Sequence, residues 1–461
     1  MDVTTKKVIT IIAALGSFLV PFMTSSVNIA LPVIGKEFSM DAVLLSWVAT
    51  SYLLASAIFL VPFGKLADIY GRKKIYTFGF ITFTITSMLC TFSFSPFLLI
   101  AIRVVQGIGS AMIFSTGVAI LTSAFSAGER GKALGINTAA VYLGLSGGPI
   151  IGGFLTQAFG WRGVFWVNVP IGLLVIVLTM WKLKGEWAEA EGEKFDYKGT
   201  ILYGLSLFLI IYGLSLFGDS YYNGWILTGM GIILLAMFIA WELKAVSPVI
   251  SIRLFRENRV FAFSNLAAFI NYSATFAVGF LMSLYLQYIK GFNSGDAGLV
   301  MSSQPLVMAA FSVLAGRLSD KMESRLISSI GMLITSAALL LMSFIDASSG
   351  FAIIIASLMI LGFGLALFSS PNTHAIMNSV EKRFYGIASA AIGTMRLTGQ
   401  MFSMAVANLA ISVYVGKVEI TPQLHPALIK AEKLVFLIFA VMCFAGVFAS
   451  IARGKSEGVK E

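Results

Sequence analysis

Two arginines lie inside long stretches of apolar residues, where a fixed charge can hold a substrate or an ion. Arg103 is followed one helical turn later by Gln106, and Arg396 lies near the middle of the stretch 384–413. If such stretches cross a membrane, a buried charge costs about 2.5–3.5 kcal/mol by insertion scales and marks a functional site by default. Two other interpretations stay open: Arg103 can extend to the membrane surface, and Arg396 can bond backbone carbonyls or a lipid phosphate.

A second candidate is the segment GKLADIYGRKK (64–74), which combines glycines, one acid and several basic residues. Its glycines permit a tight turn with positive φ. Its acid can pair with the arginine four residues later or lie at a helix N-terminus, where a negative charge gains about 0.3–1 kcal/mol. The segment is either a gate or an ordinary basic loop under anionic lipid. The gate residues would be Gly64, Asp68, Gly71, Arg72 and Lys73.

A third candidate is GLSGGPIIGG (144–153), which lies in a stretch of 29 residues without a charged side chain. Gly144, Gly148 and Gly152 recur every four residues and so form a smooth strip on one helix face, which lets helices approach closely in lipid. Pro149 removes a backbone donor and bends the helix. The pattern predicts a close and bendable contact between helices.

The composition decides what kind of element carries these motifs. The chain has 461 residues, of which 58% are hydrophobic and only 12% charged, about half the charge of a typical soluble domain. The apolar residues form continuous blocks, and a helix needs about 20 of them to cross a bilayer. A membrane barrel would show short alternating segments instead. The sequence predicts an all-α, polytopic membrane protein.

We expect 14 transmembrane helices. Twelve are windows without charge: 8–35, 42–64, 104–128, 133–161, 163–181, 199–218, 220–241, 260–289, 297–316, 326–345, 347–380 and 434–452. The window 75–102 contains a turn at 93–96 and supplies the third helix and the start of the fourth. The stretch 384–413 is the thirteenth.

Lysines and arginines in the loops set the orientation. With the N-terminus inside, cytoplasmic segments hold 24 of the 32 basic residues. The opposite side holds six: Lys36, Arg162, Lys290, Lys417, Lys430 and Lys433. We therefore expect a multi-pass protein of the cytoplasmic membrane with both termini in the cytoplasm. The net charge of +10 follows from this topology and gives no support for nucleic-acid binding.

The two halves of the chain repeat one another. The segment 64–75 resembles 316–327 at an offset of 252 residues, which places Gly316 and Asp320 opposite Gly64 and Asp68. At an offset of 255, the residues Gly107, Gly109, Ala111, Ser115, Gly131 and Gly144 match Gly362, Gly364, Ala366, Ser370, Gly386 and Gly399. We expect an N-terminal six-helix bundle (1–184), a solvated cytoplasmic linker (185–196), a two-helix insert (197–243) and a C-terminal six-helix bundle (258–453).

Parallel six-helix repeats are typical of many secondary transporters, and with these motifs the chain resembles the major facilitator superfamily. Its 14 spans resemble the branch of drug:proton antiporters with a two-helix insert. The segment 64–74 matches a superfamily signature, 103–111 matches a second, and 144–153 matches the antiporter signature at Gly144, Gly148, Pro149, Gly152 and Gly153. The resemblance implies a cytoplasmic gate, proton coupling through Arg103 and Gln106, and a contact between the halves at the glycines.

The first span departs from the branch. It usually carries an aspartate, but in FMTSSVNIALP (22–32) Met23 stands at that position. All 22 acids lie in loops or at span ends, so no span supplies a replacement. The residues expected around a central cavity are Met23, Asn28, Tyr142, Asn271, Tyr272, Asn372 and Arg396. The arginine favours an anionic or zwitterionic substrate, and methionines suit an adaptable pocket.

We expect a secondary active exporter that moves small amphiphilic molecules or drugs by alternating access and proton antiport. No P-loop occurs, so the transport is not expected to be driven by ATP. The protein is not expected to be an enzyme, because its two scattered histidines make no catalytic or metal constellation. The expected partners are a small-molecule substrate, protons and membrane lipids; no cofactor, metal or nucleic acid is expected, and the protein is expected to be a monomer. The alternative is an exporter of an anionic or lipid-like metabolite without the usual carboxylate in the first span.

Overall fold

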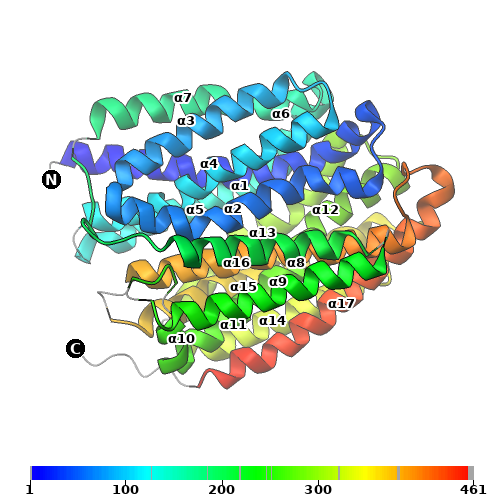
Figure 1. The fold of residues 1–461 in the computed structure, drawn as a ribbon. Helices are drawn as coiled ribbons and strands as arrows, with labels where there is room; N and C mark the ends of the chain where they lie inside the picture. The colour runs from blue at the N-terminus through cyan, green and yellow to red at the C-terminus, as the bar shows by residue number, and fades with distance from the viewer. Residues whose placement is uncertain are drawn as a thin grey trace. The chain divides into compact units, whose positions relative to one another are not determined.

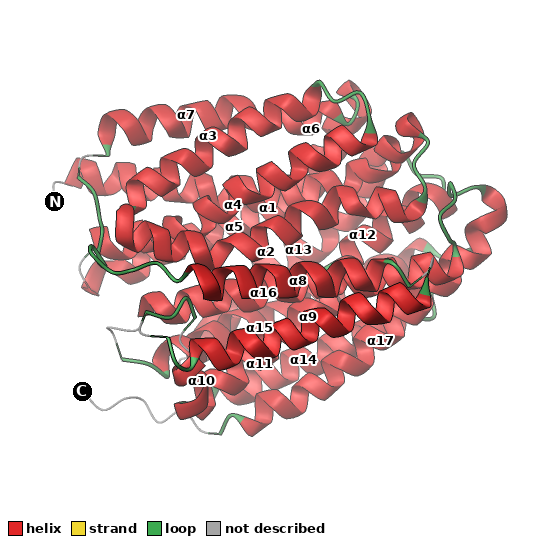
Figure 2. Ribbon diagram, in the orientation of Figure 1, coloured by secondary structure: helices red, strands yellow, loops and turns green. Residues whose placement is uncertain are grey.

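The computed structural model describes residues 3–125, 127–183, 185–217, 220–245, 247–250, 252–319, 322–381 and 385–454, and these ranges contain helices and loops but no strand (Figures 1 and 2). Each predicted span coincides with a helix or with consecutive helices, which confirms the predicted fold class. The elements are α1 (Val3–Phe38), α2 (Ala42–Tyr70), α3 (Arg72–Thr91), α4 (Pro96–Ala124), α5 (Ala127–Phe159), α6 (Arg162–Trp166), α7 (Asn168–Lys182), α8 (Tyr197–Ser215), α9 (Tyr221–Glu242), α10 (Ile252–Glu257), α11 (Arg259–Thr275), α12 (Ala277–Leu284), the π-helical turn η1 (Tyr285–Ile289), α13 (Ser294–Ser319), α14 (Ser324–Met342), α15 (Phe351–Asn378), α16 (Tyr385–Tyr414), the 3₁₀ turn η3 (Pro422–Leu424) and α17 (His425–Ala452).

The predicted turn between the third and fourth spans is confirmed. Ser95 precedes α4 and accepts a hydrogen bond from the Leu98 amide at 3.3 Å, and Pro96 occupies the first position of the helix. Serine at the N-cap satisfies an amide that has no partner inside the helix. Proline fits the next position because its missing N–H would be unpaired there anyway.

Twelve helices or helix runs in the described part of the chain are long and apolar enough to cross a membrane by themselves. The two predicted spans that fall below this measure are α3 and α16, which carry more polar residues. In α3 the polar residues Thr84, Thr86 and Ser87 are buried, and α3 packs side by side with α4 and α7 (Figure 1). Protein rather than lipid therefore covers part of this helix, so it does not need a uniformly apolar surface.

The contacts divide the chain into two compact units. The first unit consists of Met1–Met40, Leu44–Leu209 and Met230–Ile250, and the second of Asp41–Val43, Ile210–Gly229 and Ser251–Glu461. In this division α8 and α9 each contribute to both units. The bundle and insert boundaries given above stay a prediction.

The predicted repeat has the same helix packing in each unit. In the first unit, a Cβ atom on Gly107 of α4 would meet the backbone of Tyr52 in α2; in the second, one on Gly362 of α15 would meet the backbone of Gln304 in α13. Likewise α4 approaches α3 at Gly109, and α15 approaches α14 at Gly364. The two units therefore use glycine at equivalent points to bring equivalent helices together.

Candidate functional site

The segment 64–74, called the signature turn below, forms the junction between α2 and α3. Gly71 has φ 114°, a conformation that side chains other than glycine rarely adopt. Asp68 accepts a hydrogen bond from Nε of Arg72 at 2.8 Å, so the predicted pairing of these residues is confirmed. Gly64 has a different role: it lies inside α2, where an added Cβ would be 3.7 Å from Ser115 of α4.

The linker between α7 and α8 contacts the signature turn. Both carboxylate oxygens of Glu189 accept hydrogen bonds from Arg72, from Nη1 at 2.8 Å and from Nη2 at 2.9 Å. Glu186 accepts from the backbone N–H of Lys73 at 2.7 Å. A bidentate carboxylate–guanidinium pair is stronger and more specific than a single contact. The linker is largely exposed, but its acids also contact the signature turn, which the sequence did not predict.

Two further contacts fasten the same linker to the first unit. Glu193 accepts from Nζ of Lys65 at 2.5 Å and from the hydroxyl of Ser247 at 2.7 Å. The backbone also takes part, since the amide of Ala190 donates to the carbonyl of Asp68 at 2.9 Å. We call residues 186–193 the acidic strap. Each exposed ion pair contributes little by itself, about 0–1 kcal/mol, so the strap depends on several contacts acting together.

The strap should loosen at low pH. Hydrogen bonds from Lys65 and Ser247 lower the pKa of Glu193 below its ordinary value of 4.5. A carboxyl group whose pKa is lower in the folded state contributes stability above its ordinary pKa, and this stability is lost as the pH falls through the folded-state pKa. We expect amide hydrogen exchange in 186–193, corrected for the intrinsic rate, to increase as the pH falls below about 4.5.

The variant Glu193→Gln should show faster exchange of the strap already at neutral pH, where the wild type is protected. The matched control is Glu191→Gln, which removes an exposed acid of the same strap and should leave the exchange unchanged. Equal protection of the strap in Glu193→Gln and wild type would contradict this assignment.

The second copy of the signature turn is described in part. Gly316 lies in α13, where an added Cβ would be 3.1 Å from Oγ of Ser370 in α15. This environment matches that of Gly64 beside Ser115 in the first unit. Asp320 lies outside the described residues.

Arg103 does not extend to the membrane surface. It is 1% exposed, and its guanidinium group lies 4.1 Å from the ring centroid of Tyr52. Nε donates to the carbonyl of Val48 at 3.0 Å, and Nη1 donates to Oε1 of Gln106 at 2.6 Å. Nε2 of Gln106 in turn donates a hydrogen bond to the hydroxyl of Ser87 at 2.7 Å. The predicted pair is thus brought together as a buried hydrogen-bonded network that joins α2, α3 and α4.

The second unit shows that the fold does not require this network. At the repeat offset of 255, Arg103 and Gln106 correspond to Leu358 and Leu361, which are both buried in α15. The same helix position is therefore filled by a polar network in one copy and by apolar packing in the other. A buried charge is costly and is rarely kept for packing alone, which favours a functional role for Arg103.

The glycine strip of Gly144, Gly148 and Gly152 packs against α1 of the same unit. An added Cβ on Gly144 would meet the backbone carbonyl of Phe18, and one on Gly152 would lie 2.6 Å from Cβ of Ser26. Ser26 also donates a hydrogen bond to the carbonyl of Gly148 at 3.0 Å. Within its own unit the strip therefore faces α1. The contact between the two halves at these glycines stays a prediction.

Pro149 lies inside α5, as predicted, and Gly153 is buried beside the strip. Proline leaves one carbonyl of the preceding turn without its helical partner. In the turn of α5 that precedes the proline, Oγ of Ser25 lies 3.4 Å from the carbonyl of Gly144. The glycine strip allows a close helix pair, in which Ser25 and Ser26 of α1 reach backbone carbonyls of α5.

Three of the predicted cavity residues lie in the first unit. Met23 is fully buried in α1, and its sulfur accepts a weak hydrogen bond from Asn168 at 3.5 Å. Asn28 is 5% exposed, and its Oδ1 has no hydrogen-bond partner among the described residues. Tyr142 is half-buried in α5. A buried amide oxygen without a partner is a candidate to bind a substrate donor or a water.

The other four lie in the second unit. Asn271 is fully buried in α11 without a hydrogen bond from its side chain in the described part of the chain, whereas Tyr272 and Arg396 are half-buried. Asn372 is occupied: it donates to the carbonyl of Ser264 at 3.1 Å and accepts from Arg453 at 3.0 Å. The gathering of residues from both units into one cavity stays a prediction.

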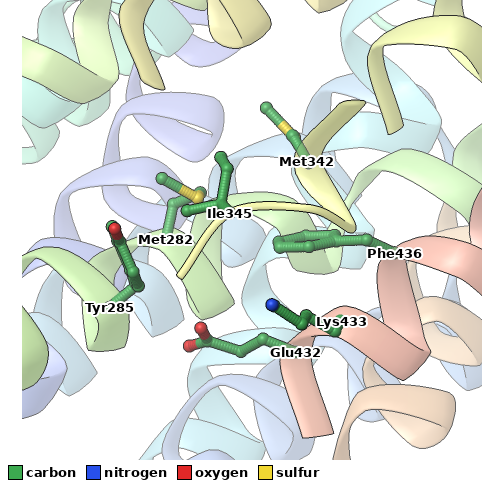
Figure 3. Close-up of a pocket in the computed structure, with 7 residues that line it drawn as sticks. All are labelled: Met282, Tyr285, Met342, Ile345, Glu432, Lys433 and Phe436. Atoms are coloured by element: carbon green, nitrogen blue, oxygen red, sulfur yellow. The ribbon is translucent and has the colours of Figure 1, made fainter. Parts of the chain in front are cut away.

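Three buried charged residues were missed in the sequence, and one of them is Glu242, which ends α9 and is 3% exposed. Arg453 follows α17, is 2% exposed, and donates to Asn372 and Ser264. Glu432 lies inside α17 and is 4% exposed (Figure 3). The statement that all acids lie in loops or at span ends is therefore wrong. The apolar window begins at residue 434, but α17 begins at His425, because a helix in contact with protein can include charged residues in its first turns.

The packing of repeated helical units and the signature residues define a membrane transporter and not an enzyme. The family model of the Major Facilitator Superfamily matches residues 13–265 and 264–460, nearly the whole chain. The chain belongs to this superfamily.

Similar proteins include transporters that are named for different substrates. The chain is 33% identical over 394 residues to the riboflavin transporter RibZ of Clostridioides difficile (strain 630), covering 85% of each protein. It is 29% identical to the multidrug resistance protein Stp of Mycobacterium tuberculosis (strain CDC 1551 / Oshkosh), over 89% of this chain and 77% of that protein. It is 31% identical to the cephamycin export protein CmcT of Amycolatopsis lactamdurans, over 86% and 83%.

A solved structure shares the fold. A bacterial homologue of the human lysosomal transporter Spinster, in an inward-facing and unoccupied conformation, has a TM-score of 0.71 and 16% sequence identity, with 98% of both chains covered. At this identity the similarity establishes the fold and says nothing further about substrate.

Proposed function

We propose that the protein is a secondary active exporter that moves small amphiphilic molecules or drugs across the cytoplasmic membrane by alternating access and proton antiport. The observation that carries this proposal is the complete antiporter signature in α5, whose glycine strip packs closely on α1. The similarity to the multidrug resistance protein Stp and the cephamycin export protein CmcT supports export of amphiphilic compounds.

In this proposal both termini lie in the cytoplasm, as the distribution of basic residues in the loops favours. The signature turn and the acidic strap then lie at the cytoplasmic face. Their contacts suit a gate, because Arg72 joins α3 to Asp68 of α2 and to Glu189 of the strap. The functional unit is proposed to be a monomer.

A second candidate is export of an anionic or lipid-like metabolite without a carboxylate in the first span. Two observations favour it: Met23 stands where the branch usually has an aspartate, and Arg396 is half-buried in α16. The similarity to a riboflavin transporter also favours a polar heteroaromatic substrate over a lipophilic cation.

Transport into liposomes separates the two candidates. Purified protein would be reconstituted with an imposed proton gradient, and the movement of tetraphenylphosphonium, riboflavin and an amphiphilic organic anion would be measured with and without an uncoupler. Uncoupler-sensitive movement of the cation would support the drug:proton antiporter. Movement of riboflavin or the anion alone would favour the second candidate. Movement of none of the three would contradict both.

Arg396 should matter only for the second candidate. We expect Arg396→Gln to reduce transport of the amphiphilic anion by about tenfold, which is about 1.4 kcal/mol of binding energy. Arg396→Lys keeps the positive charge and should retain more of the transport. Equal loss in both variants would show that geometry, and not charge, is what Arg396 contributes.

A further inference from the structure

We propose that Glu432 in α17 binds the proton that is coupled to transport, and that it holds a proton in the conformation seen here. The proposal rests on proton antiport as the proposed function. It assigns to the second unit the carboxyl group that the first span lacks at Met23.

The surroundings of Glu432 favour the neutral form of its side chain over the ionised form. The residue is 4% exposed, and its Oε1 has no hydrogen-bond partner in the described part of the chain. It borders a narrow space, called the hollow below, that lies between α12, η1, the end of α14 and α17 (Figure 3). The other residues that line this hollow are Met282, Tyr285, Met342, Ile345, Lys433 and Phe436.

The polar neighbours of Glu432 are engaged elsewhere. The hydroxyl of Tyr285 donates to the backbone carbonyl of Asp346 at 2.7 Å. Lys433 forms no ion pair with Glu432 among the described residues, and its charge acts on Asp346. Hydrogen bonds from Ser348, and less strongly the charge of Lys433, lower the pKa of Asp346, which lies in the exposed loop after α14.

Among the described residues, no hydrogen bond or ion pair joins Glu432 to a charged side chain of α11, α14, α16 or η1, which pack on α17. Lys290, which follows η1, donates to the carbonyls of Ala347 and Ser349, and Arg396 lies near the middle of α16. The basic residues of α11 and α14, Arg259 and Arg325, lie in their first turns, at the end of the unit where α17 finishes: Arg259 donates to the carbonyl of Ala452. An isolated ionised carboxylate in such surroundings costs far more than a neutral one. A solvent proton bound to the carboxylate, forming one O–H bond without redox change, removes that cost.

The adjacent backbone offers a means of release. Tyr285 begins the π-helical turn η1. Such turns are rare in proteins overall, but those that occur are often at functional sites. A shift of η1 would open the hollow to water and allow the carboxyl group to ionise. Glu432 can therefore exist in two protonation states that depend on one local rearrangement, as a coupling site requires.

Infrared spectroscopy tests proton binding without knowledge of the substrate. Difference spectra of the full chain in nanodiscs, between acidic and alkaline pH, should contain a carbonyl band of a protonated carboxylic acid that persists at neutral pH. The band should vanish in Glu432→Gln and remain in Glu419→Gln, which removes an exposed acid of the loop before α17. Glu432→Asp should shift it. A band that is identical in wild type and Glu432→Gln would overturn the proposal.

Transport then tests coupling. Glutamine mimics a protonated glutamate, so Glu432→Gln should fold, exchange labelled substrate at equal pH, and lose about tenfold or more of gradient-driven accumulation, as expected for coupling between two sites. Unchanged gradient-driven accumulation in this variant would overturn the proposal. If the wild type shows no gradient-driven transport while the band depends on Glu432, the antiport proposal fails and the proton site stands.

Discussion

Replacing Gly144 by alanine is expected to abolish transport and to destabilise the protein by about 1–3 kcal/mol, the usual cost of overpacking a close contact. The added Cβ would meet the backbone carbonyl of Phe18 in α1, and it would lie 3.1 Å from the backbone nitrogen of Phe22. A backbone cannot rotate away as a side chain can. The helices α1 and α5 would therefore have to separate, which also breaks the hydrogen bond from Ser26 to Gly148.

The matched control is Gly147→Ala, three residues along the same helix. There an added Cβ would only touch a side-chain atom of Ile151 at 3.5 Å, an ordinary contact. Thermal unfolding in detergent and transport in liposomes would be measured for both variants. If Gly144→Ala transports as well as Gly147→Ala, the strip is not a point of obligatory contact.

Exchanging both Arg103 and Gln106 for leucine should strongly reduce gradient-driven transport while the protein still folds. The second unit has buried leucines, Leu358 and Leu361, at the equivalent positions of α15. The double variant would therefore have the same residues at this position of the repeat in both units. Replacing both partners of a buried polar pair by apolar groups can be nearly neutral for stability. We expect transport to fall by about tenfold or more, the scale of a lost coupling.

The single variant Arg103→Leu provides the comparison. It leaves Oε1 of Gln106 without the donor that Arg103 supplies, and an unsatisfied buried group costs about 1–3 kcal/mol. We therefore expect the single variant to be less stable than the double variant in thermal unfolding. A double variant that folds and still transports with the gradient would show that the network has no part in coupling.

Much of the fold could be predicted because its signals are local or periodic. The positions of the helices were predicted from apolar blocks long enough to span a membrane. The repeat was predicted from glycines at a constant offset, and the equivalent packing of Gly107 and Gly362 agrees with it. The pair of Asp68 and Arg72 was predictable because the two residues flank one tight turn, which Gly71 permits with its positive φ.

The rest depended on contacts that no local pattern contains. Glu189 meets Arg72 across 117 residues of sequence, and an acidic linker looks the same whether it is solvated or bound. Glu432 was misplaced because Lys430 and Lys433 interrupt the apolar pattern, although α17 continues through them. The glycine strip was recognised correctly, but which neighbour it faces depends on the rotation of α5 in the bundle.

All three nitrogens of the Arg72 guanidinium group donate hydrogen bonds to protein acceptors. Nε is taken by Asp68, Nη2 by Glu189, and Nη1 is shared among Glu189, Ser123 and the carbonyl of Ala119. A lipid phosphate could bind Arg72 only by displacing the acidic strap, so headgroup and strap are competitors for one cation. The composition of the membrane then sets the balance between them, and anionic lipid would favour the released linker.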